Sequence, residues 1–524
     1  MTKQYESSRK LNEKIMNGVN KLADAVGTTL GPRGRNVIIK QNKMKPIITK
    51  DGVTVAKFVD LEDPFENLGA QVIKQASEET NTSAGDGTTT ATILARGILD
   101  KAQSHLVSGI SPIEMKRGID LAVENVVAEL KERAKPVSSR EEIEQIATIS
   151  ANGDKGIGKI IGSAVDAVGK DGAISIQEAK SNDTSLVLSE GFRFDSGLLA
   201  NPFITDERRG VMKHDDCLIL VTDHSISSID DILPVLEVAS RDGRALIIVA
   251  EDISGQALAA MIMNAMKGTM RVAGIKAPRY GEERRNILSD LAISVGGTFV
   301  SRESGLKLTS VKLEHLGTAE TVESNKTFTT IVGGNQDDEK VEERVNLLKA
   351  EIERETSMQK CEAIQERITR LASAVAIIKV GGATEVDMVE RKHRVEDALE
   401  AVSSAQQEGI IPGGSVCLLR AAKKLNIDAE TREQQVGVDI VRNALEEPFR
   451  KMTTNAGLPT ELLLEKVKNH TNSESGLDVS TGEIVNMYTY GIIDPTKVVR
   501  CALQNAASAA STLLLTDYAI VEEQ

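Results

Sequence analysis

The clearest chemical signal in the sequence is a run of glycine and threonine, Gly85–Thr90 (GDGTTT), directly before an Ala/Ile/Leu-rich helical pattern. Glycines let backbone N–H groups approach a phosphate chain, and a helix N-terminus with neighbouring hydroxyl groups supplies further donors. Asp86 adds a carboxylate of the kind that holds Mg²⁺. An ordinary capped helix has similar residues at its start. The run by itself therefore leaves both phosphate binding and helix capping open.

Other glycine-rich segments carry weaker signals. Gly153–Lys159 satisfies the G-x-x-x-x-G-K pattern of a P-loop, but Ile160 stands where Ser or Thr is needed to ligate Mg²⁺. No buried strand precedes this segment, so we expect a solvated turn. Leu30–Gly34 and Pro412–Gly414 have the composition of turns that line nucleotides, although each alone is only a loop signal.

Composition excludes several classes of function. The 524-residue chain has a formal net charge of −14, which disfavours broad nucleic-acid binding, and it has no Trp for base stacking. Its longest apolar runs, such as Ala245–Ala250, have the length of strands rather than of membrane spans. Its four cysteines and six histidines show no metal-ligand spacing. The first residues resemble neither a signal peptide nor a presequence, so we expect a cytoplasmic protein.

The elements that must position these residues change in character along the chain. Apolar residues at steps of three or four over residues 11–30 predict a helix that ends at Gly31-Pro32. From about 190 to 375, strand-length apolar runs alternate with helical patterns, which is typical of an α/β domain. Helices dominate again from Val395. This order predicts that both ends of the chain share one domain and that the middle is inserted.

Six segments resemble, in order, the GroEL-type (group I) chaperonins, and the resemblance runs from about residue 10 to 520. They are Asp24–Asn36, Thr49–Val53, Ala84–Thr92, Ala147–Asn152, Val395–Leu399 and Asp494–Lys497. The resemblance implies a multidomain α+β subunit with an α/β apical domain inserted in the middle of the chain. The implied domains are a mostly helical equatorial ATP-binding domain (1–133 and 408–524), an intermediate hinge domain (134–189 and 376–407) and an apical substrate-binding domain (190–375).

The resemblance also implies an ATPase site, with ATP and Mg²⁺ as cofactors and K⁺ as a further candidate. Asp86 matches the Mg²⁺ ligand, and Asp397 matches the carboxylate that orients the attacking water once the hinge closes, with Asp51 assisting. Without the resemblance, Asp51 reads as a turn former and Asp397 as a helix surface residue. Asp478 stands where the family commonly has Asn. The implied nucleotide contacts are Thr29, Leu30, Gly31, Pro32, Lys50, Gly87, Thr88, Thr89, Thr90, Gly414, Asp478 and Asp494.

A second implied surface would bind unfolded chains or a co-chaperonin loop. Its residues match the family's apical apolar grooves: Leu198, Phe203, Leu233, Leu236, Leu258, Ile262 and Met263. The helical spacing of Leu233/Leu236 and Leu258/Ile262 alone favours core packing, whereas the resemblance favours exposure. The implied partners are the chain itself in seven-membered rings, usually two stacked, with unfolded client proteins and a GroES-type co-chaperonin. Neither nucleic acid nor a membrane is expected.

The function that follows from the resemblance is an ATP-dependent molecular chaperone. It would capture non-native polypeptides in a ring cavity and promote their folding through allosteric, ATP-driven cycling. An ATP-dependent small-molecule phosphotransferase and a passive holdase scaffold are the alternatives. Departures from the family pattern imply a divergent member: no Gly/Met-rich tail precedes the end at Gln524, and Ser196 and Thr82 replace charged residues of interdomain salt bridges. Acidic inter-ring residues are also absent around Leu458-Pro459.

Overall fold

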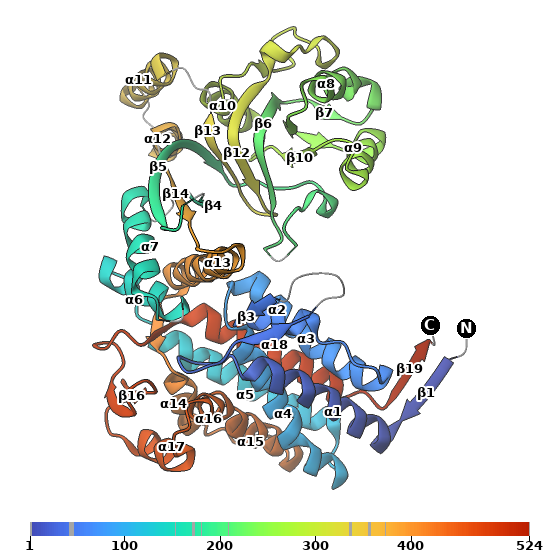
Figure 1. Ribbon diagram of the computed structural model, residues 1–524, viewed down its shortest axis with the longest axis vertical. Helices are drawn as coiled ribbons and strands as arrows, with labels where there is room; N and C mark the ends of the chain where they lie inside the picture. Colours follow the sequence, from blue (N-terminus) through green and yellow to red (C-terminus); the bar gives the residue numbers. More distant parts are fainter. Residues whose placement is uncertain are drawn as a thin grey trace. The chain divides into compact units, whose positions relative to one another are not determined.

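The chain forms two compact units, and both of its ends contribute to the first. The computed structural model describes residues 3–40, 47–151, 153–169, 173–179, 181–207, 209–334, 338–354, 358–372 and 374–522. Unit 1 comprises Met1–Ser163, Glu178–Thr184 and Val380–Gln524, and unit 2 comprises Ala164–Gln177 and Ser185–Lys379. In Figure 1 the blue and red ends of the chain interleave within unit 1. The division into three domains stays a prediction.

Long helices form the core of unit 1. The main ones are α1 (Ser8–Gly27), α3 (Pro64–Ala84), α4 (Thr88–Val107), α5 (Pro112–Arg133), α15 (Arg432–Ala444) and α18 (Thr496–Leu514). Their apolar faces meet in one cluster, in which Ala-rich α18 packs against α3, α4 and α5. Small side chains permit this close approach of helix backbones. The helical character predicted from Val395 onward is confirmed in this part of the core.

Shorter elements of unit 1 surround this core. The helices are α2 (Gly52–Phe58), α6 (Arg140–Ser150), α7 (Lys155–Val168, which continues into unit 2), α13 (Glu385–Glu408), α14 (Val416–Lys424), α16 (Glu447–Asn455) and α17 (Thr460–Asn469). The strand pairs, all antiparallel, are β1 (Lys3–Ser7) with β19 (Tyr518–Glu522), β2 (Val37–Ile39) with β3 (Ile47–Thr49), β15 (Ile410–Pro412) with β18 (Ile493–Pro495), and β16 (Ser475–Asp478) with β17 (Glu483–Asn486).

Helix α1 ends earlier than its periodicity predicts. Its last residue is Gly27, whereas the apolar pattern runs on to Leu30. The hydroxyls of Thr28 and Thr29 donate to the carbonyls of Ala25 and Val26, both at 2.8 Å. Threonine side chains that bond backward in this way compete with the helical pattern. The end of α1 is therefore a turn that leads into Leu30–Gly34.

Unit 2 is built on a mixed sheet with helices beside it. Within the described residues the sheet order is β10-β8-β6-β12-β13-β5-β14-β4, and β11 also pairs with β6. The strands are β4 (Ala173–Glu178), β5 (Ser185–Phe194), β6 (Met212–Thr222), β8 (Ala245–Ala250), β10 (Val272–Lys276), β11 (Phe299–Val300), β12 (Gly317–Ser324), β13 (Thr329–Gly334) and β14 (Ala374–Val380). Strands β6, β8, β10 and β11 are parallel. The alternation of strands and helices predicted for this segment is confirmed.

Five long helices accompany that sheet. They are α8 (Ile229–Asp242), α9 (Gly255–Lys267), α10 (Gly281–Ser294), α11 (Asp338–Arg354) and α12 (Met358–Ala372). Figure 1 shows α8 and α9 to one side of the strands and α10, α11 and α12 to the other. Buried strands such as β8 therefore read as continuous apolar runs. In the part of the chain that the structure describes, no helix combines the length and apolarity required to cross a bilayer.

Candidate functional site

The GDGTTT loop (Gly85–Thr90) reverses the chain between α3 and α4. Gly85 and Gly87 adopt φ values of 74° and 85°, a left-handed conformation that favours glycine. Gly87 is the N-cap of α4, and as a glycine it has no side chain to accept a hydrogen bond from the first N–H groups of that helix. Those N–H groups carry the positive end of the helix dipole. The start of α4 therefore has the properties of an anion site.

Asp86 lies in this loop with its carboxylate held by two hydrogen bonds. Its Oδ1 accepts from the Gly87 N–H at 2.5 Å, and its Oδ2 accepts from the Ser150 hydroxyl of α6 at 2.9 Å. Burial raises the pKa of Asp86 above its usual value, and the nearby Asp51 carboxylate adds to this increase. The ionised form of Asp86 is thus disfavoured, and a bound cation would relieve that cost.

Asp51 and Thr29 are brought to the same loop. Asp51 caps α2 by accepting from the N–H groups of Val53 and Thr54, both at 3.1 Å. A Cβ atom placed on Gly52 would lie 2.3 Å from Thr89 Oγ1, so the start of α2 touches the start of α4. The hydroxyls of Thr29 and Thr89 are 3.4 Å apart. Asp51 is therefore the N-cap of a helix rather than only a turn former, and it lies at the edge of the GDGTTT loop.

Asp494 adds a carboxylate from near the C-terminus. It pairs with Ile411 across β15 and β18, and a Cβ on Gly413 would lie 2.8 Å from its Oδ1. Burial raises the pKa of Asp494 to about 7, the charge of Asp86 adds to this effect, and a hydrogen bond from the Gly414 N–H opposes it. Three aspartates separated widely in sequence, at positions 51, 86 and 494, are therefore electrostatic neighbours.

Asp478 closes a turn beside this group. Its Oδ1 accepts from the Ser480 N–H at 2.8 Å, and its Oδ2 accepts from the Thr481 hydroxyl at 3.1 Å. Arg33 donates to the Ser480 carbonyl at 2.9 Å, which joins the Leu30–Gly34 turn to the β16–β17 turn. Asn455 holds the other side of Leu30–Gly34 by donating to the Leu30 carbonyl at 3.0 Å. The proposed nucleotide contact of Asp478 stays a prediction.

Helix α13 brings Asp397 into unit 1, along with residues that sequence reasoning missed. The Ser404 hydroxyl donates to the Ala84 carbonyl at 2.9 Å, and a Cβ on Gly85 would lie 1.9 Å from Glu400 Oε2. Ser150, which contacts Asp86, was also missed. Spacing offered one signal, because Asp397, Glu400 and Ser404 fall on one helical face. The other predicted contacts, Gly31, Pro32, Lys50 and Thr90, lie in the turn after α1, before α2 and in the first turn of α4.

The P-loop-like segment Gly153–Lys159 is a capped helix start. Asp154 Oδ1 accepts from the N–H groups of Gly156 and Ile157 at 2.9 and 3.2 Å. Arg394 approaches the other oxygen of Asp154 at 3.4 Å. A carboxylate of the chain thus takes the N–H groups that a phosphate would need. The segment begins α7 rather than forming the solvated turn that we expected.

The donor set fits a magnesium ion shared with phosphate rather than an all-protein metal site. Among the described residues, no group of three or more His, Cys, Asp or Glu side chains is arranged to hold a metal ion. Mg²⁺ commonly takes one or two carboxylates together with phosphate oxygens and water. Asp86, with its raised pKa beside a helix N-terminus, matches the protein's share of such a site.

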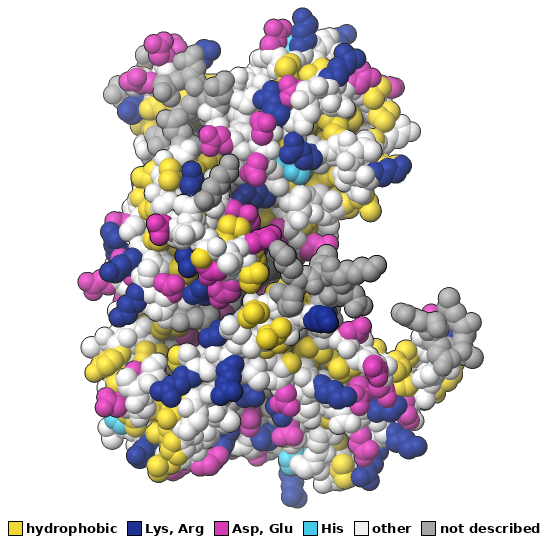
Figure 2. All heavy atoms as spheres, in the orientation of Figure 1, with side chains coloured by type: hydrophobic (Ala, Val, Ile, Leu, Met, Phe, Trp, Pro, Cys, Tyr) yellow, Lys and Arg dark blue, Asp and Glu magenta, His cyan; other side chains and the backbone are white. Residues whose placement is uncertain are grey.

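The predicted apolar surface of unit 2 divides into exposed and buried residues. Leu233 on α8 is 44% exposed and Met263 on α9 is 54% exposed, whereas Phe203 and Leu236 are buried in the core. Leu198, Leu258 and Ile262 are partly buried against that core. Figure 2 shows hydrophobic side chains on the surface of unit 2 where α8 and α9 lie. The exposed subset is thus narrower than the predicted set.

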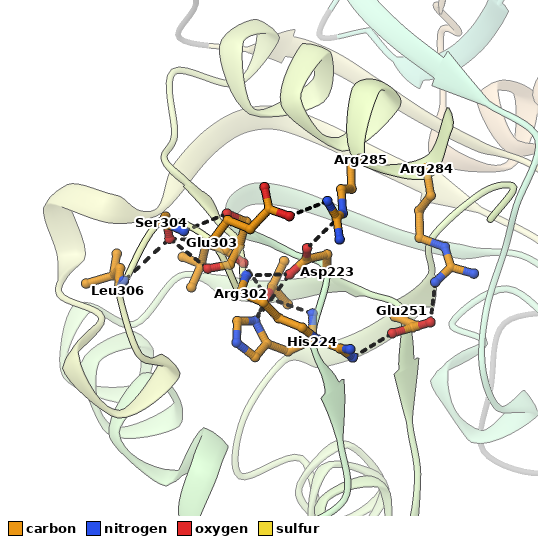
Figure 3. Close-up of polar contacts among 12 residues, drawn as sticks. Asp223, His224, Glu251, Arg284, Arg285, Arg302, Glu303, Ser304 and Leu306 are labelled. Atoms are coloured by element: carbon orange, nitrogen blue, oxygen red, sulfur yellow. Dashed lines mark hydrogen bonds and ion pairs between the residues drawn. The ribbon is translucent and has the colours of Figure 1, made fainter. Parts of the chain in front are cut away.

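A polar network occupies the carboxyl ends of the parallel strands of unit 2 (Figure 3). Open α/β sheets often bind ligands at this edge, so the network is a competing candidate site. Its acids face arginines, however: Arg302 Nη2 lies 2.8 Å from Glu251, and Arg285 Nε lies 3.7 Å from Asp223. Arg284 of α10 also pairs with Glu251. The network therefore joins α10 to the sheet edge and is best interpreted as structural.

These features define a chaperonin-type subunit, with a helical unit around a glycine-threonine loop and an inserted α/β unit that exposes apolar helices. The TCP-1/cpn60 chaperonin family model matches residues 22–524, and the chain belongs to this family. The resemblance seen in the sequence is thus confirmed, and the protein is a chaperone. Neither a phosphotransferase nor a passive scaffold gains support.

Solved structures share this fold. The chain is similar to the chaperonin gp146 from the bacteriophage EL 2 (Pseudomonas aeruginosa), crystallised in the presence of ATP-BeFx. Crystal form II gives a TM-score of 0.67 at 23% identity, covering 99% of each chain. Crystal form I gives a TM-score of 0.62 at 22% identity, again over 99% of each chain. The predicted multidomain α+β fold class is confirmed by this likeness.

Proposed function

We propose that this chaperonin hydrolyses ATP in unit 1 and uses the reaction to drive the capture and folding of non-native polypeptides. The observation that carries the proposal is the convergence of the GDGTTT loop with Asp51, Asp86 and Asp494, which come from distant parts of the chain. Phosphoryl transfer to water depends on positioning and charge stabilisation more than on covalent chemistry. A relative crystallised with ATP-BeFx supports the same assignment.

Each group of residues has a role in this proposal. The first N–H groups of α4 and the hydroxyls of Thr88–Thr90 donate to phosphate oxygens. Asp86 holds Mg²⁺, which supplies neutralisation of the charge on the phosphates when bound. Asp397 accepts a hydrogen bond from the attacking water and orients it, with Asp51 assisting. Gly414, Asp478 and Asp494 hold the nucleoside end.

The proposal extends to assembly and clients. Leu233 and Met263 would contact non-native chains through their exposed apolar surfaces, with Met adapting to varied sequences. The proposed assembly is a pair of stacked seven-membered rings with allosteric coupling between subunits. The proposal also includes a GroES-type co-chaperonin, K⁺ as a second cation and a cytoplasmic location. Electron microscopy of the purified protein with and without Mg-ATP tests the ring and its response to nucleotide.

The decisive experiment removes Asp397. Asp397→Ala should keep ADP affinity and lose about 100-fold in ATP turnover, because orientation of the water is lost and the phosphate contacts remain. Asp100→Ala is a matched control, since Asp100 is an exposed carboxylate in the same unit. ATPase assays with denatured protein added would show whether clients stimulate the reaction. Normal turnover in Asp397→Ala would refute the assigned role.

A further inference from the structure

Ser404 of α13 makes a buried hydrogen bond to the end of α3. Its side chain is 3% exposed, and its hydroxyl donates to the Ala84 carbonyl at 2.9 Å. Ala84 is the last residue of α3, where helix carbonyls lack partners within the helix. The bond therefore satisfies a terminal carbonyl immediately before the GDGTTT loop.

Glu400, one turn earlier on α13, lies directly against the loop. A Cβ atom on Gly85 would fall 1.9 Å from Glu400 Oε2 and 2.2 Å from Glu400 Cβ. Gly85 also has a φ of 74°, so both its conformation and the approach of Glu400 require glycine there. Helix α13 thus packs on the backbone of Ala84 and Gly85 without an intervening side chain.

Asp397 shares a helical face with these two residues. The three positions are spaced as i, i+3 and i+7, which places their side chains in one row along α13. The C-terminal end of α13 is held separately, because Arg500 of α18 donates to both carboxylate oxygens of Glu408, at 2.9 and 2.5 Å. The contacts of Ser404 and Glu400 therefore fix the part of α13 that lies on the Ala84–Gly85 backbone, in the same row of side chains as Asp397.

We propose that Ser404 and Glu400 are positioning residues that fasten α13 to the Ala84–Gly85 backbone and so hold Asp397 in place for hydrolysis. The inference rests on the proposed ATPase function. It predicts that these residues affect turnover rather than nucleotide affinity. The nucleotide contacts belong to α4, α2 and the β15–β18 region, whereas the water-orienting carboxylate belongs to α13.

Ser404→Ala tests the hydrogen bond in the full-length assembled protein. It should lower kcat about five- to tenfold, the change expected from the loss of one buried hydrogen bond, and leave ADP affinity and thermal midpoint near wild type. Ser403→Ala is the matched control, because Ser403 is the adjacent serine on the exposed side of α13. Equal kcat values for the two variants would overturn the inference. A Ser404→Ala protein that also loses ADP affinity, or fails to fold, would show that Ser404 is structural and overturn its positioning role.

Glu400 provides an independent test. Glu400→Ala should lower kcat about threefold through loss of packing on Gly85, and Glu400→Gln, which keeps the side-chain shape, should restore most of the rate. Wild-type kcat in Glu400→Ala would refute its positioning role. Turnover in the wild-type protein separates the two levels of argument. If the wild type hydrolyses ATP and the Ser404→Ala and Glu400→Ala variants have the same kcat as the Ser403→Ala control, the positioning inference fails and the proposed ATPase function stands. A wild type without turnover would overturn the proposed ATPase function, and this inference with it.

Discussion

Asp290 in unit 2 and Asp494 in unit 1 show two opposite ways to enclose a carboxylate. Asp290 is 1% exposed and accepts from Arg367 at 2.7 and 3.0 Å and from Arg344 at 2.9 Å. Asp494 accepts from an uncharged N–H, has Asp86 as an electrostatic neighbour, and has its pKa raised to about 7. One aspartate is neutralised by the fold, and the other is held beside a second acid.

The surroundings of these carboxylates distinguish a structural role for Asp290 from a functional role for Asp86 and Asp494. Asp290 joins α10 to α11 and α12, so its ion pairs maintain the packing of unit 2. Asp86 and Asp494 instead lie in an arrangement of burial and like charge that destabilises their ionised forms. Perturbed titratable groups clustered in this way are typical of functional sites. The polar network of Figure 3 also pairs each acid with arginines, so we interpret it, like the ion pairs of Asp290, as structural.

The largest expected effect on stability is that of replacing Asp290. Asp290→Asn should destabilise unit 2 by about 3–5 kcal/mol, because it leaves the buried Arg367 and the partly buried Arg344 without their carboxylate. Hydrogen exchange along α10–α12 and urea unfolding would measure this. Glu303→Gln, which changes an exposed acid of the same unit paired with Arg285, should cost less than about 1 kcal/mol. Similar losses in the two variants would remove the basis of the comparison.

Replacing Asp86 should have the opposite effect on stability, because it should stabilise the nucleotide-free protein while slowing ATP turnover. Asp86→Asn should reduce Mg²⁺-dependent ATP turnover about 100-fold, since the cation loses its protein ligand. The same change should raise the thermal midpoint of the nucleotide-free protein, because it removes a carboxylate whose charged form is disfavoured. Calorimetry and ATPase titration with Mg²⁺ would measure both effects. A lower midpoint in this variant would show that the Asp86 charge is stabilised by the fold after all.

Nucleotide affinity should depend on pH through Asp494. Its pKa of about 7 means that the folded protein retains a proton which the unfolded chain has released. The stability contributed by this group therefore falls as pH rises from its ordinary pKa toward 7. A ribose hydroxyl donates best to the ionised carboxylate, so ADP affinity should fall by up to about tenfold per pH unit below 7. Titrations of the wild type should show this slope, and Asp494→Asn should abolish it. A wild-type affinity independent of pH would contradict the role.

The smallest effect on stability is expected at the exposed apolar positions. Leu233→Ser should change the free energy of unfolding by less than about 0.5 kcal/mol, whereas Leu236→Ser, at a side chain only 7% exposed, should cost about 2–3 kcal/mol or more. Capture of a denatured client should weaken several-fold in Leu233→Ser, as measured by suppression of client aggregation. Full capture by this variant would remove α8 from the proposed surface.

Local pattern was sufficient for much of the fold. The apolar steps of α1, the strand runs of β6, β8 and β10, and the Ala-rich α18 could all be read from the chain, because each depends on neighbours within a few residues. The GDGTTT run could be located for the same reason, since its glycine conformations are local. The end of α1 and the start of α7 were misjudged where Thr28, Thr29 and Asp154 redirect nearby backbone hydrogen bonds.

The sequence by itself therefore predicted the elements and the inserted middle, whereas the roles of Asp51, Asp86 and Asp397 came from the family resemblance and stay predictions. Tertiary structure alone decided which residues meet. Ser404 reaches Ala84 across 320 positions, and Ser150 reaches Asp86 across 64. It also decided that Leu233 is exposed while Leu236, on the same helix, is buried. Periodicity shows that a helix has an apolar face, but only the packing of other elements determines how much of that face is covered.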